Sequence, residues 1–403
     1  MPAMAPSFYP TAGPLEVMTA LANGRKGTTP GEPTGHLSGT TPDGHVYQDE
    51  AVLRSEYQRF FYRNWLLVGR EEQIPKTGDY LTRTIGTEAI VLLRDKQGQV
   101  RGFQNVCRHR GTLLLEEPCG SGLRSIVCPY HAWTYGLDGR LTGAGYMQAV
   151  QGFRKEDNGL FPVQVESAAG FLWINLDPRA QPLAAQLGPF FERVARFPLA
   201  ELRAGPTHNY TIEANWKLLV ENYSECYHCA PIHPELNRIT PFNTGDNDAF
   251  FTEGKAQFNG GFQTFAGDYT SMTMTGYTRR PPLPGMTDED RKRIYYYVLW
   301  PNTFFSLHPD YLMVHTAWPI SPGRSRVENQ FFFDPAVMAK PDFDPTDAVG
   351  LWDIINKQDW HVCELAQKGT QTRSWHGGRY SEQETLVWDF DAYYQEQMGR
   401  NGP

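Results

Sequence analysis

Two short segments, each with one cysteine and one histidine, constrain the fold of this 403-residue chain more than any other feature. Cys107 and His109 form the pattern C-x-H, and Cys128 and His131 form the pattern C-x-x-H eighteen residues later. Cysteine and histidine at such short spacing are typical of metal ligands. Zinc fingers open with two cysteines and close with two histidines, whereas each segment here supplies one of each. The pattern therefore predicts two metal-binding loops, and the flanking Gly111 fits a loop at the tip of a β-sheet.

One cysteine and one histidine per loop suit a Rieske [2Fe–2S] cluster, in which two histidines replace two cysteines on one iron. Cys107, His109, Cys128 and His131 are the predicted ligands. A structural zinc site on the same four residues is the alternative, and two buried cysteines with unrelated histidines is another. Cys119 has no partner at ligand spacing, and we interpret it as a thiol in a turn.

A second candidate metal site lies in residues 214–230, which we expect to form one helix that ends at Pro231. Glu225 and His228 fall on the face opposite the apolar stripe, and His233 follows in the turn. Two histidines and one carboxylate are the ligands of many non-haem Fe(II) sites. A polar helix face with hydrogen-bonded histidines is the simpler alternative. The expected apolar stripe consists of Trp216, Leu219, Val220, Tyr223 and Tyr227.

A helix expected over residues 349–368 offers the third ligand. Asp359 falls at the edge of the apolar stripe, whereas Asp353 and Glu364 fall on the side toward solvent. An inward carboxylate needs a partner because an unpaired buried charge is costly. A metal ion would supply that partner, and so would a buried arginine or a backbone donor. The expected stripe consists of Leu351, Ile354, Ile355, Val362 and Leu365.

The distribution of residue types along the chain predicts an α+β protein with three parts. Residues 1–45 are rich in Pro, Gly and Thr and are expected to form an extended N-terminal arm. In residues 46–178, short β-type runs alternate with turn signals, which predicts an all-β domain. Residues 179–403 combine helical segments with aromatic-rich strand-like segments, which predicts an α+β domain with an antiparallel sheet.

Composition excludes several classes of protein. The 37 basic and 45 acidic residues give a net charge of −8, which argues against nucleic acid or an anionic membrane as a partner. No run reaches the length of a membrane span. We expect a cytoplasmic protein, because the sequence shows no signal-peptide pattern and its six cysteines are too sparse for a disulfide framework.

The motifs together resemble Rieske non-haem iron oxygenases, in particular their alpha, or terminal oxygenase, subunits. Asn105–Gly111 with Cys128–Trp133 resembles the cluster-binding loops, and Glu221–His228 with His233 resembles the iron-binding helix. The resemblance covers most of the chain except residues 1–45. It implies a Rieske domain followed by a helix-grip-like catalytic domain that contains mononuclear Fe(II).

By this resemblance His228, His233 and Asp359 are iron ligands, the last through the match of Gln358-Asp359 followed by Cys363-Glu364. Glu225 matches a bridging carboxylate that links the iron site to a Rieske histidine of a neighbouring subunit, here His131. Many members have Asp at that position. The family implies a homotrimer and a separate reductase with flavin and ferredoxin-type centres. The sequence contains no nucleotide-binding glycine fingerprint or plant-type ferredoxin run. Cys226 and Cys229 are interpreted as packing thiols.

The resemblance implies a small-molecule substrate that reacts with O2. Three segments look most like the branch that acts on glycine betaine, stachydrine, carnitine or choline, which implies hydroxylation or N-demethylation next to a quaternary nitrogen. An aromatic pocket could hold such a cation, or a benzenoid acid, as in aromatic-ring-hydroxylating dioxygenases. A Rieske electron carrier without oxygenase activity is a further alternative. The three segments are Glu225–Leu236, Ser306–Tyr311 and Gly378–Ser381, and the candidate pocket residues are Tyr223, Tyr295, Tyr297 and Trp300.

Overall fold

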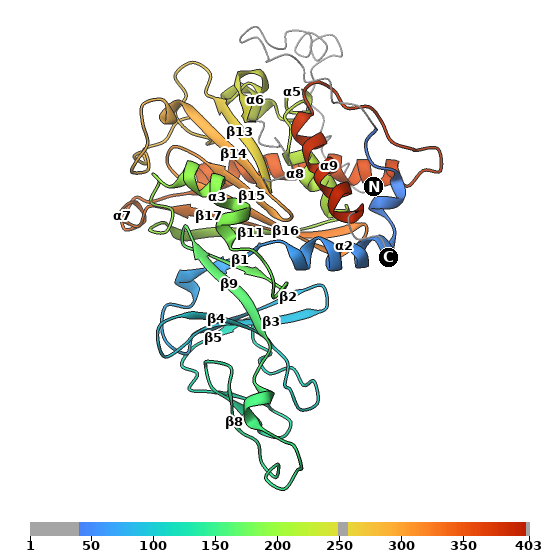
Figure 1. Ribbon diagram of the computed structural model, residues 1–403. Coiled ribbons are helices and arrows are strands. Elements are labelled where there is room, and N and C mark those ends of the chain that lie inside the picture. The colour runs from blue at the N-terminus through green and yellow to red at the C-terminus, as the bar shows by residue number, and fades with distance from the viewer. Residues whose placement is uncertain (1–39, 249–256, 400–403) are drawn as a thin grey trace, which may run out of the picture. The chain divides into compact units, whose positions relative to one another are not determined.

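A computed structural model describes residues 40–248 and 257–399, and the chain divides into two compact units (Figure 1). One unit comprises residues 57–192, and the other comprises residues 40–56 together with the described part of residues 193–399. The division lies within α2 (Glu50–Arg59) and α3 (Leu183–Val194), whereas we expected boundaries near 46 and 178. Most of the expected arm, residues 1–39, lies outside the described residues.

The unit of residues 57–192 consists mainly of antiparallel sheet, as its short alternating runs predict. A seven-stranded sheet has the order β1-β10-β9-β4-β3-β2-β5, and a three-stranded sheet has the order β6-β7-β8. The seven strands are β1 (Leu66–Arg70), β2 (Tyr80–Ile85), β3 (Glu88–Arg94), β4 (Val100–Gln104), β5 (Cys119–Gly120), β9 (Pro162–Ala168) and β10 (Phe171–Asn175), and the three are β6 (Ile126–Val127), β7 (Thr134–Tyr135) and β8 (Leu141–Gly143). Both Cys/His segments are loops of this unit, one after β4 and one between β6 and β7.

The other unit is built on a seven-stranded antiparallel sheet with the order β11-β17-β16-β15-β14-β13-β12. Residues directly opposite each other on neighbouring strands share one face of the sheet. Helices α4, α8 and α9 pack with its strands (Figure 1). The strands are β11 (Arg203–Ile212), β12 (Asp246–Asp248), β13 (Phe258–Thr264), β14 (Arg293–Leu299), β15 (Thr303–Leu307), β16 (Leu312–Ser321) and β17 (Arg324–Phe333), and the helices are α4 (Trp216–Tyr223), α5 (Cys229–Ile232), α6 (Pro234–Ile239), α7 (Pro335–Met338), α8 (Thr346–Thr370) and α9 (Thr385–Gly399).

The single helix expected over residues 214–230 is wrong, because α4 ends at Tyr223. Ser224 Oγ donates to the Val220 carbonyl at 2.7 Å, and the Glu225 carboxylate accepts the backbone N–H groups of Tyr227 and His228. Side chains that bond the local backbone in this way compete with helix continuation. Tyr227, expected in the core, is therefore 42% exposed.

The expected helix over residues 349–368 corresponds to α8, which extends from Thr346 to Thr370. Its buried face differs in part from the predicted apolar stripe, since Leu365 is 40% exposed and the polar residues Asn356 and Gln367 are buried. The carbonyl of Gln367 accepts from Thr370, and its side chain joins Asn215 and Tyr47. Among the described residues, no helix combines the length and the apolar composition that a membrane crossing requires.

A buried ion pair joins α2, α4 and α9. Lys217 Nζ lies 2.5 Å from Glu56 Oε1, and both side chains are 0% exposed. The Glu56 carboxylate also accepts from Trp216 Nε1 at 2.8 Å and from the Tyr394 hydroxyl at 2.6 Å. Full burial means that neither charge has water to replace a lost partner.

Lys217→Met should lower the free energy of unfolding by about 3–5 kcal/mol, because it leaves the Glu56 charge buried without its cation. The double variant Glu56→Gln/Lys217→Met should lose less. Lys357→Met removes an exposed partner of Asp353 and serves as the control, with an expected change of about 0–1 kcal/mol. Chemical denaturation of the purified variants measures all three, and equal losses at Lys217 and Lys357 would contradict the prediction.

Candidate active site

The two Cys/His loops have the same backbone hydrogen bonds. In the first loop, the Cys107 N–H donates to the Thr112 carbonyl, and the Cys107 carbonyl accepts from the Gly111 N–H. In the second loop, the Cys128 N–H donates to the Trp133 carbonyl, and the Cys128 carbonyl accepts from the Ala132 N–H. In both loops the fourth residue after the cysteine has a positive φ, 71° at Gly111 and 57° at Ala132. The sequence signal at Gly111 thus has a structural reason, since glycine adopts this conformation without strain.

The cysteines and the histidines of these loops differ in burial, which fits a cluster with cysteine ligands on the buried side and histidine ligands on the exposed side. Cys107 and Cys128 are buried, whereas His109 and His131 are exposed, with ring centroids 4.8 Å apart. Burial opposes ionisation of Cys128, but the backbone N–H groups of Tyr130 and His131 lower its pKa below the usual thiol value. The thiolate is the form that binds metal.

The four residues do not fit a single zinc ion. Tetrahedral zinc with bonds of about 2.0–2.3 Å brings all its ligand atoms close together. Across residues 40–248 and 257–399, one group of three or more His, Cys, Asp or Glu side chains has its ligand atoms within 4.8 Å of one another, and it is His228, His233 and Asp359. The four loop residues form no such group in the described part of the chain, which favours a two-iron cluster over one zinc ion.

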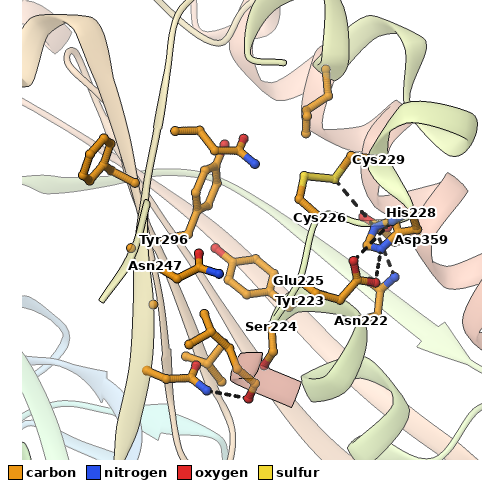
Figure 2. A pocket seen from close by; sticks show the side chains of 18 of the residues that line it. Asn222, Tyr223, Ser224, Glu225, Cys226, His228, Cys229, Asn247, Tyr296 and Asp359 are labelled. Carbon is orange, nitrogen blue, oxygen red and sulfur yellow. Dashed lines mark hydrogen bonds and ion pairs between the residues drawn. A yellow bond between two sulfur atoms is a disulfide. The ribbon is translucent and has the colours of Figure 1, made fainter. Parts of the chain in front are cut away.

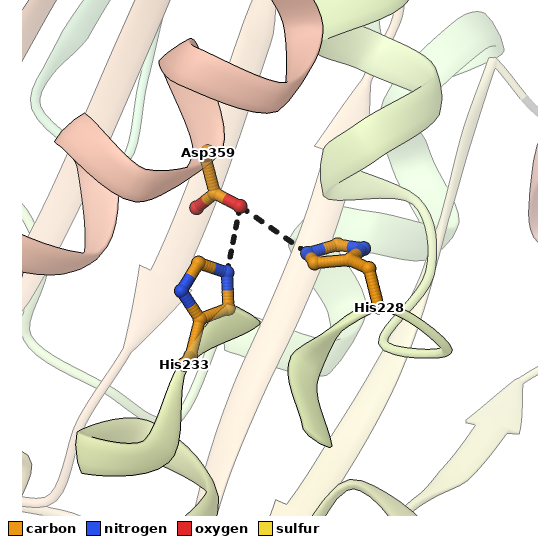
Figure 3. A group of neighbouring side chains, drawn as sticks. All are labelled: His228, His233 and Asp359. Atoms are coloured by element: carbon orange, nitrogen blue, oxygen red, sulfur yellow. Dashed lines mark hydrogen bonds and ion pairs between the residues drawn. The ribbon is translucent and has the colours of Figure 1, made fainter. Parts of the chain in front are cut away.

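His228, His233 and Asp359 meet between two parts of the chain (Figure 3). Asp359 Oδ1 lies 2.7 Å from His233 Nε2 and 3.2 Å from His228 Nε2. Asp359 comes from α8, while His228 precedes α5 and His233 lies between α5 and α6. The structure thus brings together the three residues that the sequence predicted as iron ligands, in a two-histidine, one-carboxylate arrangement.

Further contacts orient both imidazoles. Glu225 Oε1 lies 2.5 Å from His228 Nδ1, and Gln358 Oε1 lies 2.7 Å from His233 Nδ1. Each ring thus has its Nδ1 occupied and its Nε2 directed at Asp359. Such contacts fix the tautomer and orientation of a metal-binding histidine.

Carboxylates make this site favourable for positive charge. Burial alone would lower the pKa of His228, but Glu225 and Asp359 outweigh it and raise that pKa to about 10. Burial opposes the charge on Asp359 in turn, yet His233 and His228 hold the pKa of its carboxyl well below the usual range. A divalent cation fits the same donor set, since it satisfies the carboxylate and both neutral imidazoles.

A cavity of about 710 Å³, including space open to solvent, adjoins His228 and Asp359. Figure 2 shows Tyr296 and Asn247 on the side of the sheet and His228 with Asp359 opposite them. The aromatic residues that line it are Tyr223, Phe262, Tyr296 and Trp352, and the carboxylate residues are Glu225 and Asp359.

Three predicted pocket residues do not line this cavity, and Tyr296 does instead. Tyr295 and Tyr297 neighbour Tyr296 on β14, so their side chains point to the other face of the sheet. Tyr295 donates to Asp290 at 2.6 Å. Trp300 is buried against Tyr393, with ring centroids 4.7 Å apart. The aromatic composition indicated that β14 contributes to the pocket. Because residues 295–297 are all tyrosines, the sequence could not show which of them faces the cavity.

The interpretation of Cys226 and Cys229 as packing thiols is also wrong, because a disulfide joins them. Cys229 Sγ lies 4.0 Å from His228 Nε2. Ser306, which the sequence analysis named only as part of a segment, contacts the Tyr223 hydroxyl. Sequence reasoning missed Asn259 and Gln263, which line the cavity from β13. These residues carry no motif, and only strand register could have indicated them.

Comparison with known proteins agrees with both halves of the chain. Residues 64–154 match the Rieske [2Fe-2S] domain, and residues 199–400 match the catalytic domain of the ring hydroxylating alpha subunit. The glycine betaine monooxygenase oxygenase subunit of Pseudomonas aeruginosa is 30% identical over 380 residues, 88% of each chain. The carnitine monooxygenase oxygenase subunit of Acinetobacter baumannii is 30% identical over 82% of this chain and 85% of its own.

Solved structures share the fold. A quaternary ammonium Rieske monooxygenase aligns with a TM-score of 0.75 and 25% identity, covering 93% of this chain and 99% of its own. Naphthalene 1,2-dioxygenase from Rhodococcus sp. aligns with a TM-score of 0.72 at 20% identity, covering 90% and 95%. The two matched domains imply a Rieske cluster and a mononuclear iron. The chain therefore belongs to the family of Rieske-type ring-hydroxylating oxygenase alpha subunits.

Proposed function

We propose that this chain is a terminal oxygenase that hydroxylates or N-demethylates a small quaternary ammonium compound. An oxygenase subunit of this family uses O2, a small-molecule substrate and electrons from a reductase. We further propose a separate flavin and ferredoxin-type reductase and a cytoplasmic location. The relatives named for glycine betaine and carnitine support this substrate class over an aromatic acid.

We assign the cluster to Cys107, His109, Cys128 and His131, and Fe(II) to His228, His233 and Asp359. Bound there, iron supplies the oxygen-activating chemistry, and three protein ligands leave positions open. Glu225 and Gln358 orient the imidazoles of His228 and His233. The cavity walls place the substrate beside these histidines and Asp359. The triad also weighs against a pure electron carrier, which has no use for it.

The observation that carries the substrate class is the combination of aromatic rings and carboxylates around one cavity. Tyr223 stacks on Phe304 with ring centroids 4.8 Å apart, and meets Tyr296 edge to face at 6.2 Å. Aromatic faces attract a quaternary ammonium group, and the carboxylates of Glu225 and Asp359 add negative charge. A benzoate-like anion would meet like charge at the same carboxylates without the positive charge that a betaine also carries.

Glu225 gives a route for electrons if the chain forms a head-to-tail homotrimer, which is a closed heterologous ring. Its carboxylate contacts His228 within the chain. We propose that it also accepts a hydrogen bond from His131 of a neighbouring subunit, so that one residue bridges the cluster of one chain and the iron of the next.

Asp359→Ala should lose the mononuclear iron and oxygenation but keep the absorbance of the Rieske cluster, because the two ligand sets share no residue. Asp353→Ala is the matched control on the same helix, since Asp353 bonds Tyr210 and Lys357. It should retain the iron. Metal analysis gives two irons per chain for the first variant and three for the second, and loss of iron from Asp353→Ala would contradict the assignment.

Glu225→Gln should keep both metal centres and the oligomer but slow electron transfer from the cluster to the iron, because it preserves size and removes charge. Single-turnover experiments with pre-reduced protein measure that transfer, while iron content and sedimentation check the rest. Loss of the iron would show that Glu225 is a direct ligand, and an unchanged transfer rate would remove the bridge.

A trimethylammonium compound should bind more tightly than its neutral tert-butyl analogue, by about 0.5–2 kcal/mol for each good aromatic contact. Titration of the holoenzyme with the pair, followed by NADH-coupled turnover with a reductase, tests the substrate class. Tyr296→Leu should reduce the difference, whereas Tyr295→Leu, on the opposite face of β14, should not. Equal binding of the pair would overturn the quaternary ammonium assignment and leave the oxygenase family unchanged.

A further inference from the structure

Two buried amide oxygens on β13 line the cavity without a hydrogen-bond partner. Asn259 is 0% exposed and Gln263 is 8% exposed, and Asn259 Oδ1 and Gln263 Oε1 have no partner in the described structure. Buried polar atoms are nearly always paired, so an unpaired one at a cavity wall calls for an explanation. Both residues line the cavity beside the iron-site residues His228 and Asp359.

Strand register places both amides on the same face as the rest of the cavity floor. Asn259 lies opposite Val298, and Gly261 lies opposite Tyr296. Val298 and Tyr296 also line the cavity. Residues two apart on a strand share a face, so Asn259, Gly261 and Gln263 follow one another along the floor. Gly261 lies between the two amides in close contact with the backbone of β12, where a Cβ would lie 2.2 Å from the Asp246 carbonyl oxygen.

The orientation of the Asn259 amide is fixed by its other end. Its Nδ2 donates to the Leu386 carbonyl at 2.8 Å, and a carbonyl can only accept. A flipped amide would set two acceptors against each other, so the free atom of Asn259 is an oxygen. It accepts a hydrogen bond and cannot donate one. Gln263 Oε1 provides a second acceptor on the same strand.

A quaternary nitrogen carries no hydrogen, so the cation itself cannot satisfy these acceptors. A carboxylate accepts only and would face them unfavourably. A hydroxyl group is the small neutral group that donates. We propose that Asn259, with Gln263, binds a hydroxyl group of the substrate, and that this enzyme prefers hydroxyl-bearing quaternary ammonium compounds over those without a donor. The proposal rests on the proposed function and adds the specificity-determining residues to it.

Matched ligand pairs test the proposal in the holoenzyme. Choline is compared with n-propyltrimethylammonium, in which a methyl group replaces the hydroxyl, and L-carnitine is compared with γ-butyrobetaine. The hydroxyl compound of at least one pair should bind on the order of 10- to 100-fold more tightly, the range expected when a buried acceptor loses its donor. A larger affinity ratio for the carnitine pair than for the choline pair would indicate that the natural substrate also carries a carboxylate.

Variants identify the acceptor. Asn259→Leu should bring the affinity ratio close to one, because it removes the buried acceptor. Gln263→Met removes the second acceptor without breaking a side-chain hydrogen bond that the structure shows, so it remains informative if Asn259→Leu does not fold. Asn247→Leu is the control, because Asn247 lines the cavity but is solvent-exposed. Its ratio should equal that of the wild type.

The outcomes distinguish a failure of the hydroxyl subsite from a failure of the quaternary ammonium assignment. A ratio near one in the wild type for both pairs, or a ratio unchanged in both Asn259→Leu and Gln263→Met, overturns the hydroxyl subsite while the quaternary ammonium assignment stands. Failure of the wild type to bind any trimethylammonium compound overturns both. A general loss of affinity in a variant affects both members of a pair equally, so the ratio distinguishes lost recognition from structural damage.

Discussion

The meeting of Asp359 with His228 and His233 is the interaction on which the arrangement of the catalytic unit depends. The carboxylate and His233 are 126 residues apart in sequence, yet their atoms lie 2.7 Å apart. A largely buried carboxylate is costly unless a positive partner faces it, so α8 and the turn after α4 must be placed together. Because α4 ends at Tyr223, the chain turns before His228, and His228 Nε2 lies 3.2 Å from Asp359 of α8.

The sheet gives that site its walls. On one face of the sheet Gly261 of β13, Tyr296 of β14 and Ser306 of β15 lie in register, and Asn259 lies two residues from Gly261 on the same face. Tyr223 reaches this face from α4 through Phe304 and Ser306. The helices on that face are held in turn by the fully buried pair of Glu56 and Lys217. Residues remote from His228, His233 and Asp359 therefore help to set where the cavity floor lies relative to these three side chains.

The loop positions of the Cys/His segments and the meeting of His228, His233 and Asp359 agree with the sequence prediction, because the spacing of such residues is largely local. The Cys/His loops need only short turns with a positive φ, and Asp359 follows from helical phase within α8. Features that depend on tertiary contacts could not be predicted. Glu225 turns the chain after α4 by accepting the backbone N–H groups of Tyr227 and His228. Cys226 reaches Cys229 across the resulting turn. Which tyrosine of β14 faces the cavity depends on the pairing of β14 with β13.

Different parts of the cavity recognise two features of the substrate, its positive charge and its hydrogen-bond donor. Rings and carboxylates near the triad favour positive charge, a requirement shared by every trimethylammonium compound. The fixed oxygen of Asn259 imposes a different requirement, because a buried acceptor discriminates by the cost of remaining unpaired. Charge attraction therefore selects the class of compound, whereas the amide oxygens select within it. A chain with about 30% identity to relatives named for different substrates can thus keep the metal site and change specificity at β13.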